Sequence, residues 1–428
     1  MLGMLLVLSV THTISQDIKS SILALAESKE DLIIEWRHHF HQYPELSNRE
    51  FKTSKKIAEI LNEMGLEVQT GIAYTGVVGV LKGGKPGPVV ALRADIDGLP
   101  ITETSNLPYK SMEKTNYAGQ EVGVMHACGH DTHISILLGV AKVLSEVKND
   151  IPGTVKFIFQ PAEEGPPEGE EGGAGLMIKE GVMKNPDVQA IFGLHTWSEI
   201  PSGVIKYKPG GTMASSNEFF IKVHGAQTHG GRPWGGTDPI VTASQIVNNL
   251  QTIVSRNLEL TNEPAVISIG TIHGGVRSNI IPNYVEMSGT IRTFDEEMRQ
   301  TIFKRMKEIV EHTGASNGGS AEITIHPGNP VTFNDVELTK AMLPTLEEVA
   351  GKENVILTKG VTPAEDFSKY QQVVPGLFLH LGGLATGKDP SKAPAHHTPE
   401  FTTSDEGMLL GVKALSRLAV DYLLEHQN

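Results

Sequence analysis

The sequence predicts an α/β protein with two domains, one inserted into the other. Its 428 residues are too many for a single small core. Several apolar runs with the length of buried parallel strands are each followed by acidic or histidine residues. Between about residues 214 and 327 the pattern changes to the order β-α-β-β-α-β, which is typical of a ferredoxin-like unit.

The outer domain is expected at residues 17–213 and 328–428, and the inserted domain at 214–327. Apolar periodicity predicts two N-terminal helices, and Gly65 ends the second as a C′ glycine. The elements expected in the outer domain are helices at 18–40, 50–64, 134–147, 336–349 and 405–424, and apolar strands at 89–100, 154–159, 188–194 and 373–381. Those expected in the inserted domain are strands at 218–223, 265–272, 284–293 and 321–326, and helices at 239–257 and 296–313.

Composition excludes one class of partner. The net charge of −14 argues against nucleic acid, because neutralising phosphates requires clustered Lys and Arg. A hydrophobic content of 39% and a charged content of 20% suit a soluble globular protein, with no membrane partner expected. With a single cysteine, no intrachain disulfide can form.

The first ten residues form an apolar run that is too short to span a bilayer. The run resembles the apolar part of a secretory signal, with small residues near Ser15 as a cleavage site, but it lacks the positively charged start. Residues 1–16 are therefore either a leader, which would make the protein periplasmic or exported, or a disordered tail of a cytoplasmic protein.

The stretch from Met125 to His133 concentrates three histidines, one aspartate and the only cysteine in nine residues. It directly precedes the apolar run that predicts the helix at 134–147. Cys128 and His130 are thus expected in the turn before a helix N-terminus, where a thiol is readily held as thiolate, the form that binds metal. A Cys-Gly-His triplet alone is a weak signal.

Three predicted strands supply further candidates. One ends at Asp95 and Asp97, a second leads into Glu163 and Glu164, and a third ends at His195. In open α/β sheets, sites form beyond the carboxyl ends of the strands. The sequence therefore predicts that these side chains converge with the Cys-Gly-His turn.

The candidate metal ligands combine one thiolate, three imidazoles and a carboxylate: Cys128, His130, Glu164, His195 and His397. Five protein ligands exceed what one open catalytic zinc takes, so two metals sharing a bridging ligand and a water fit better. Manganese or zinc is favoured, with cobalt and nickel left open. Glu163 is placed to act as general base toward water and then as acid toward the leaving nitrogen.

These motifs resemble the aminoacylase-type metallo-amidohydrolases, which include N-acyl-amino-acid, hippurate and auxin-conjugate hydrolases and some carboxypeptidases. The resemblance covers about residues 25–424 in unbroken order. It is carried by 40–47 (FHQYPELS), 93–100 (RADIDGLP), 125–131 (MHACGHD), 160–164 (QPAEE), 193–195 (GLH) and 397–401 (HTPEF).

The resemblance implies a di-metal aminopeptidase-like catalytic domain with a lid and dimerisation domain inserted, and hence a homodimer. It implies that the five candidates bind metal, with His397 preferred to His396 because its spacing to the following Pro and Phe fits. Glu163 is the implied base, and His229 the implied stabiliser of the oxyanion. Asn279 and Arg292 match segments that hold the substrate carboxylate.

Asp97 is expected to orient its neighbours, and His126 and His133 to be structural or supporting residues rather than ligands. Glu168–Glu171 extends a loop that is shorter in the family; it either trims the pocket mouth or has no function.

The expected activity is hydrolysis of N-acyl-L-amino acids to a carboxylate and a free amino acid. A carboxypeptidase or dipeptidase on the same scaffold is the nearest alternative, with a short peptide as substrate. A non-catalytic binding protein is disfavoured because no base or ligand is lost. A thiol enzyme using Cys128 would leave the Glu pair unexplained.

Overall fold

The computed structural model describes residues 17–427. The leader or tail expected at residues 1–16 lies outside them. The described chain forms two compact units. The first unit combines residues up to Gly210 with Asn334–Thr358 and the segment from Lys369 onward. The second, here called the inserted unit, comprises Gly211–Phe333 and the short segment Lys359–Ser368.

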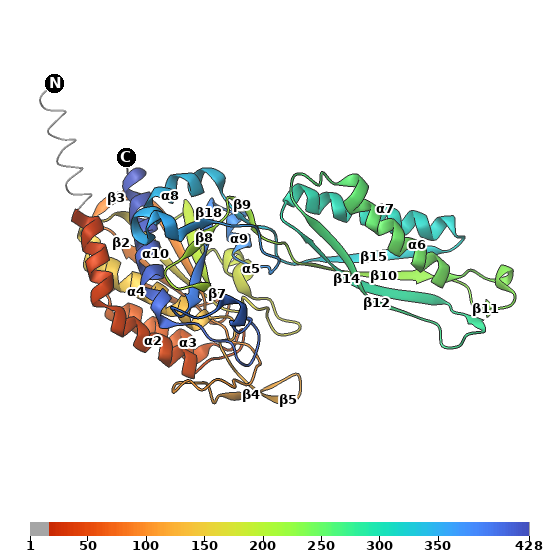
Figure 1. Ribbon diagram of the computed structural model, residues 1–428, viewed down its shortest axis with the longest axis horizontal. Coiled ribbons are helices and arrows are strands. Elements are labelled where there is room, and N and C mark those ends of the chain that lie inside the picture. Colours follow the sequence, from red (N-terminus) through yellow and green to blue (C-terminus); the bar gives the residue numbers. More distant parts are fainter. Residues whose placement is uncertain (1–16, 428) are drawn as a thin grey trace, which may run out of the picture. The chain divides into compact units, whose positions relative to one another are not determined.

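A mixed eight-stranded sheet forms the centre of the first unit, in the order β1-β2-β6-β3-β7-β18-β8-β17 (Figure 1). The strands are β1 Glu67–Ile72, β2 Gly76–Lys82, β3 Lys85–Asp95, β6 Pro152–Gln160, β7 Ala190–Pro201, β8 Ile205–Tyr207, β17 Val355–Leu357 and β18 Gly376–Leu384. The four neighbours β6, β3, β7 and β18 run parallel. The three strands predicted to end in catalytic residues are therefore adjacent, and their carboxyl ends meet at one edge of the sheet.

The first unit is held together by helices packed on this sheet. These are residues 17–28, α2 Glu30–Gln42, α3 Phe51–Glu63, α4 His130–Glu146, α5 Gly173–Lys179, α8 Val336–Ala350, α9 Ser368–Gln371 and α10 Met408–Glu425. Helix α4 is buried on nearly all sides, as its apolar sequence requires. Gly139 lets neighbouring helices approach, because a Cβ there would come within 3.0 Å of both Ile33 and Val412.

Two shorter elements complete the first unit. Strands β4 Lys114–Tyr117 and β5 Gln120–Gly123 form a hairpin that the sequence analysis did not predict. Strand β7 continues through His195 to Pro201, so the expectation that this strand ends at His195 is wrong. Strand β7 stays paired with β18 beyond His195 as far as Pro201, and this pairing stabilises the extension. No helix within residues 17–427 is long and apolar enough to cross a lipid bilayer.

The inserted unit contains an antiparallel sheet in the order β12-β14-β10-β15, with helices α6 and α7 on the same face (Figure 1). Its elements are β10 Asn217–His224, β11 Thr228–His229, α6 Pro239–Thr252, β12 Ala265–Gly274, β13 Ile280–Ile281, β14 Tyr284–Thr293, α7 Glu296–Ser316 and β15 Ser320–Pro327. Phe219, Ile221 and Val223 alternate inward from β10 into a core of its own. Strands β9 Gly210–Met213 and β16 Thr332–Asn334 pair where the chain enters and leaves this unit. The predicted α/β class and the inserted ferredoxin-like fold are confirmed.

Candidate metal centre

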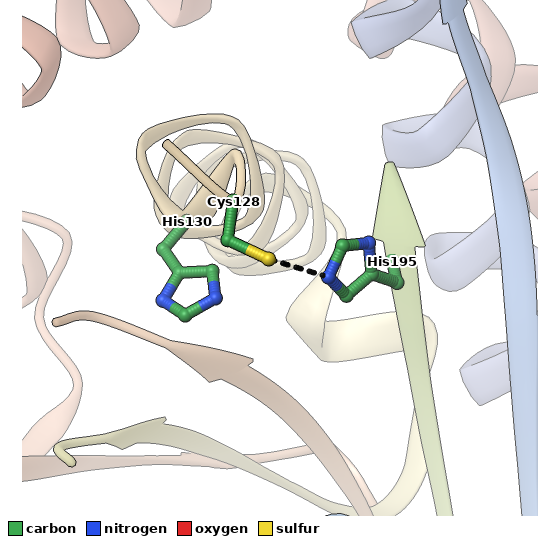
Figure 2. Close-up of side chains that lie close together, drawn as sticks. All are labelled: Cys128, His130 and His195. Atoms are coloured by element: carbon green, nitrogen blue, oxygen red, sulfur yellow. Dashed lines mark hydrogen bonds between the residues drawn. The ribbon is translucent and has the colours of Figure 1, made fainter. Parts of the chain in front are cut away.

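Cys128 belongs to two groups of side chains whose ligand atoms lie within 4.8 Å of one another. The first group is Cys128, His130 and His195, and the second is Cys128, Glu164 and His397. Figure 2 shows the first group, with Cys128 and His130 at the start of α4 and His195 on β7. The Cys128 sulfur lies 3.4 Å from Nε2 of His195 and 3.3 Å from Nε2 of His397. The geometry therefore allows the thiolate to bridge two ions.

The turn before α4 depends on Gly129. This residue has φ +89°, a left-handed conformation that favours glycine, and a Cβ there would overlap the side chain of Thr196. The turn leaves Cys128 just outside the helix and makes His130 its first residue. The backbone thus brings both side chains to the same end of α4.

In each histidine of the first group, one ring nitrogen is bonded to a backbone carbonyl and the other belongs to the group of candidate ligand atoms. Nδ1 of His130 donates to the carbonyl oxygen of Asp97 at 2.9 Å, and Nδ1 of His195 donates to that of Thr196 at 2.7 Å. These bonds hold each ring so that Nε2 is the nitrogen available to a metal, as metal-binding imidazoles require. Nε2 of His130 is buried and has no hydrogen-bond partner among the described residues.

Geometry separates the adjacent histidines 396 and 397. Nε2 of His396 lies 3.1 Å from the carbonyl oxygen of Thr196 and donates to it, so this nitrogen is already used. Nε2 of His397 lies 3.0 Å from Oε1 of Glu164. The backbone of His397 has φ 61° and is held by an N–H bond of 2.9 Å to the carbonyl oxygen of Ala127. That bond ties the His397 loop to the Cys128 turn.

A tight turn after β6 positions Glu163 and Glu164. Ala162 has φ 53°, and its N–H donates to the buried Glu50 carboxylate at 3.0 Å. The N–H of Glu164 donates to Oδ2 of Asp97 at 3.0 Å. Glu163 lies in the same group, with Oε2 4.0 Å from Nε2 of His130.

Burial and neighbouring charges shift the pKa values of Cys128 and His130. Burial, followed by the charges of Glu164 and Glu163, raises the pKa of the Cys128 thiol well above its usual value. This outweighs the effect of the helix N-terminus that the sequence analysis invoked. Burial opposes the charge of His130, but Asp95 and Asp97 raise its pKa to about 10. A divalent cation would replace both protons, so the donor set and the unpartnered His130 Nε2 fit a metal site.

Two aspartates support the site: Asp95, the last residue of β3, and Asp97, two residues further on. Asp97 contacts His130, Glu164 and the hydroxyl of Ser47, so it is a positioning residue. Asp95 accepts from Nδ1 of His133 at 2.6 Å. Nε2 of His133 in turn accepts from the N–H of Thr196, which leaves no nitrogen for a metal.

A second buried network of charged side chains, which the sequence pattern did not predict, lies beside the centre. Nδ1 of His41 lies 2.9 Å from Asp131, and Nε2 of His41 lies 3.2 Å from Glu103. Arg37 contacts the same Asp131 carboxylate. His126 is buried too, and burial lowers its pKa to about 4. The available signal was the spacing of Arg37 and His41, which places both on one face of α2.

The remaining site candidates lie in the inserted unit. His229 is exposed on β11. The N–H of the next residue, Gly230, donates to the carbonyl oxygen of Asn279, so His229 and Asn279 are neighbours. Arg292 lies at the opposite end of β14, beside β10 residues 217 and 218. At about 3.3 Å per residue, roughly 25 Å of strand separates it from the end near His229. Within one inserted unit, Arg292 and His229 therefore do not form a single site.

Comparisons with known proteins agree with this geometry. Peptidase family M20/M25/M40 matches residues 91–421. The chain is 40% identical over 395 residues to thermostable carboxypeptidase 2 of Saccharolobus solfataricus, covering 92% of this chain and 96% of that protein. It is 37% identical over 391 residues to N-acetylcysteine deacetylase of Bacillus subtilis, covering 91% and 96%.

Among solved structures, the chain is similar to a dinuclear metal binding peptidase from the M20 family of Bacillus subtilis. The TM-score is 0.76 at 35% identity, covering 94% of this chain and 99% of that one. The expected resemblance is thus confirmed: the chain belongs to peptidase family M20/M25/M40 and is a metal-dependent hydrolase of amide or peptide bonds.

Proposed function

We propose that the protein hydrolyses the amide bond of N-acyl-L-amino acids, releasing a carboxylate and a free amino acid. The observation that carries this proposal is the convergence of four candidate ligand side chains on the Cys128 thiol, with Glu163 beside them. The similarity to a deacetylase of N-acetylcysteine supports an acylated amino acid as the substrate class.

The proposed ligands are Cys128, His130, Glu164, His195 and His397. Two divalent ions held there, manganese or zinc in the first instance, would polarise the scissile carbonyl and lower the pKa of water toward about 7. Glu163 takes the proton from the attacking water and delivers it to the amide nitrogen as the C–N bond breaks. Asp97 keeps His130 and the Glu164 backbone in place during both steps.

The inserted unit is proposed to bind the rest of the substrate. His229 stabilises the oxyanion, while Asn279 and Arg292 hold the amino-acid carboxylate. Nδ1 of His229 accepts from the N–H of Gly231 at 2.9 Å, so Nε2 carries the proton that such a role requires. Because Arg292 and His229 lie at opposite ends of the inserted sheet, a substrate that touches both must draw on two copies of the chain. A homodimer through the inserted unit satisfies this requirement.

The second candidate is a carboxypeptidase or dipeptidase, favoured by the 40% identity to a carboxypeptidase. A thiol enzyme is disfavoured because Cys128 is buried and its pKa is raised. A binding protein without activity is disfavoured because the base and the ligand set are both present.

The test is amino-acid release by manganese- or zinc-loaded protein from N-acetyl and N-benzoyl amino acids and from unblocked dipeptides, with chelated protein as control. Release from the blocked substrates supports the proposal. Release from dipeptides alone overturns it in favour of a peptidase.

A further inference from the structure

A cavity of about 600 Å³ opens beside the candidate metal centre, entirely within the first unit. It lies between the β4 strand, the turn at 98–100, the segment 44–49 and the loop at 164–168. Glu164 lines this cavity and also belongs to the Cys128–Glu164–His397 group. A molecule in the cavity therefore lies next to the candidate metal ligands, and its volume is in the range of small-molecule sites.

The lining selects against a substrate carboxylate. Three lining carboxylates, Glu45, Glu113 and Glu168, form no ion pair among residues 17–427, against one such cation, Lys52. The other lining cations, Arg49 and Lys114, are already paired with Glu170 and Glu121. The remaining lining combines apolar residues with the polar Ser47, Thr115 and Asn116; the apolar ones include Leu99, Val124, Pro166, Pro167 and Tyr117. An uncharged, partly apolar group matches this balance.

The loop that forms one wall is held at both ends. At its start, the N–H of Glu164 donates to Asp97. At its end, the guanidinium of Arg49 donates to both carboxylate oxygens of Glu170. The amide of the buried Asn48 donates to Oε2 of Glu170 and to the carbonyl oxygen of Glu171, each at 3.0 Å. A bidentate guanidinium–carboxylate pair fixes direction as well as distance. Pro166 and Pro167 stiffen the span between these anchors.

We propose that this cavity receives the acyl group of the substrate and that the Gly165–Glu171 loop, held by Asn48 and Arg49 through Glu170, sets the size of acyl group accepted. The inference rests on the proposed amidohydrolase function and extends it: the preferred substrates carry uncharged acyl groups bulkier than acetyl, such as benzoyl or a medium linear chain. An acetyl group leaves most of the cavity unfilled.

The experiment measures kcat/KM for the N-acetyl, N-hexanoyl and N-benzoyl derivatives of one amino acid, with metal content determined for each protein. The wild type should prefer the larger acyl groups by about tenfold or more, the scale on which apolar pockets discriminate. Thr115→Trp fills the cavity from β4, at a residue whose side chain lines it. This variant should lose about tenfold or more toward hexanoyl and benzoyl, mainly in KM, with acetyl changed by less than about threefold.

The chain offers matched controls. Gln120→Trp places the same bulk on the same hairpin but outside the lining, and it should leave all three substrates unchanged. Glu170→Gln weakens the loop anchor and should shift the benzoyl-to-acetyl ratio by about fivefold or more. Glu171→Gln removes an equal charge from the neighbouring residue, which pairs with Lys179 instead, and should not shift that ratio.

The outcomes separate the two levels of proposal. If the wild type hydrolyses no N-acyl amino acid, the proposed function itself fails. If it hydrolyses them but Thr115→Trp lowers all acyl groups equally, or Glu170→Gln and Glu171→Gln behave alike, the function stands and the cavity is not the acyl site. If an unblocked dipeptide is assayed in parallel and its hydrolysis alone responds to Thr115→Trp, the acyl-site proposal is overturned and the cavity takes the N-terminal residue of a peptide.

Discussion

At the scale of single residues, the metal centre depends on side chains whose second polar atom is already bonded. Nδ1 of His130 and of His195 donate to backbone carbonyls, which points Nε2 of each ring into the centre. His133 differs in that Nδ1 donates to the Asp95 carboxylate and Nε2 accepts from the N–H of Thr196. One hydrogen bond thus separates a candidate ligand from a structural histidine.

Glu163 and Glu164 should fail in different ways when each is replaced by Gln. Glu163→Gln removes the group that moves the proton and should lower kcat by about 100- to 10,000-fold while metal stays bound. Glu164→Gln removes a ligand, so it should lower metal content and activity together. Elemental analysis beside steady-state kinetics measures both. Near-normal turnover by Glu163→Gln would contradict its assignment.

The neighbouring histidines 396 and 397 give the sharpest test of the ligand set. Cys128→Ala and His397→Asn should each reduce the bound metal per chain, because each removes a donor atom from the Cys128–Glu164–His397 group. His396→Asn should retain full metal content, since Nε2 of His396 bonds to a backbone carbonyl. Equal loss in the two histidine variants would show that the assignment is wrong.

At the scale of elements, buried charges join α2 to α4. Arg37 and His41 on α2 both contact Asp131, which lies in the first turn of α4 directly after His130. The same Arg37 reaches Asp405, just before α10. This network fixes the start of α4, and with it the positions of Cys128 and His130.

The network predicts a pH-dependent stability. Burial opposes the charge of His41, but Asp131 and Glu103 outweigh it and raise its pKa from 6.5 to about 9. A raised histidine pKa adds stability that is full below pH 6.5 and is lost as the pH rises through about 9. The contribution is up to about 3 kcal/mol.

The measurement is urea unfolding of the metal-free wild type and of His41→Gln between pH 6 and pH 10. The stability difference between the two proteins should shrink as the pH rises. His39→Gln, at an exposed position of the same helix, serves as the control: burial and Lys56 lower the pKa of His39, so this difference should not shrink as the pH rises. A difference that stays constant with pH would show that the pKa of His41 is not raised in the folded protein.

At the scale of the whole molecule, the candidate ligands come from separate parts of the chain that only folding brings together. They lie at the start of α4, after β6, within β7 and in the loop before α10. Bound metal should therefore stabilise the first unit, by about 4 kcal/mol at a free concentration 1,000 times Kd. The inserted unit has its own core and holds none of the five candidate ligands.

Chelation should act on the two units unequally. Hydrogen exchange measured by mass spectrometry should speed up in α4 and β7 after metal removal, with little change in α6 and α7. Adding back manganese or zinc should reverse the effect. Equal loss of protection in both units would contradict this division.

Patterns within short segments of the sequence were enough to predict the candidate residues of the site. An apolar strand leading into two glutamates and a Cys-Gly-His turn ahead of an apolar helix are patterns within a few residues, so periodicity and turn preferences predicted them. The order β-α-β-β-α-β likewise predicted the inserted fold before any contact was known.

Which side chains meet became known from the folded structure alone. It brought His41 to Asp131, 90 positions away, and Arg49 to Glu170, 121 positions away. It also extended β7 past His195 and placed Arg292 far from His229. The physical reason is that a hydrogen bond or a cavity wall forms between segments packed together in space, and such packing leaves no periodic mark in the sequence of either segment.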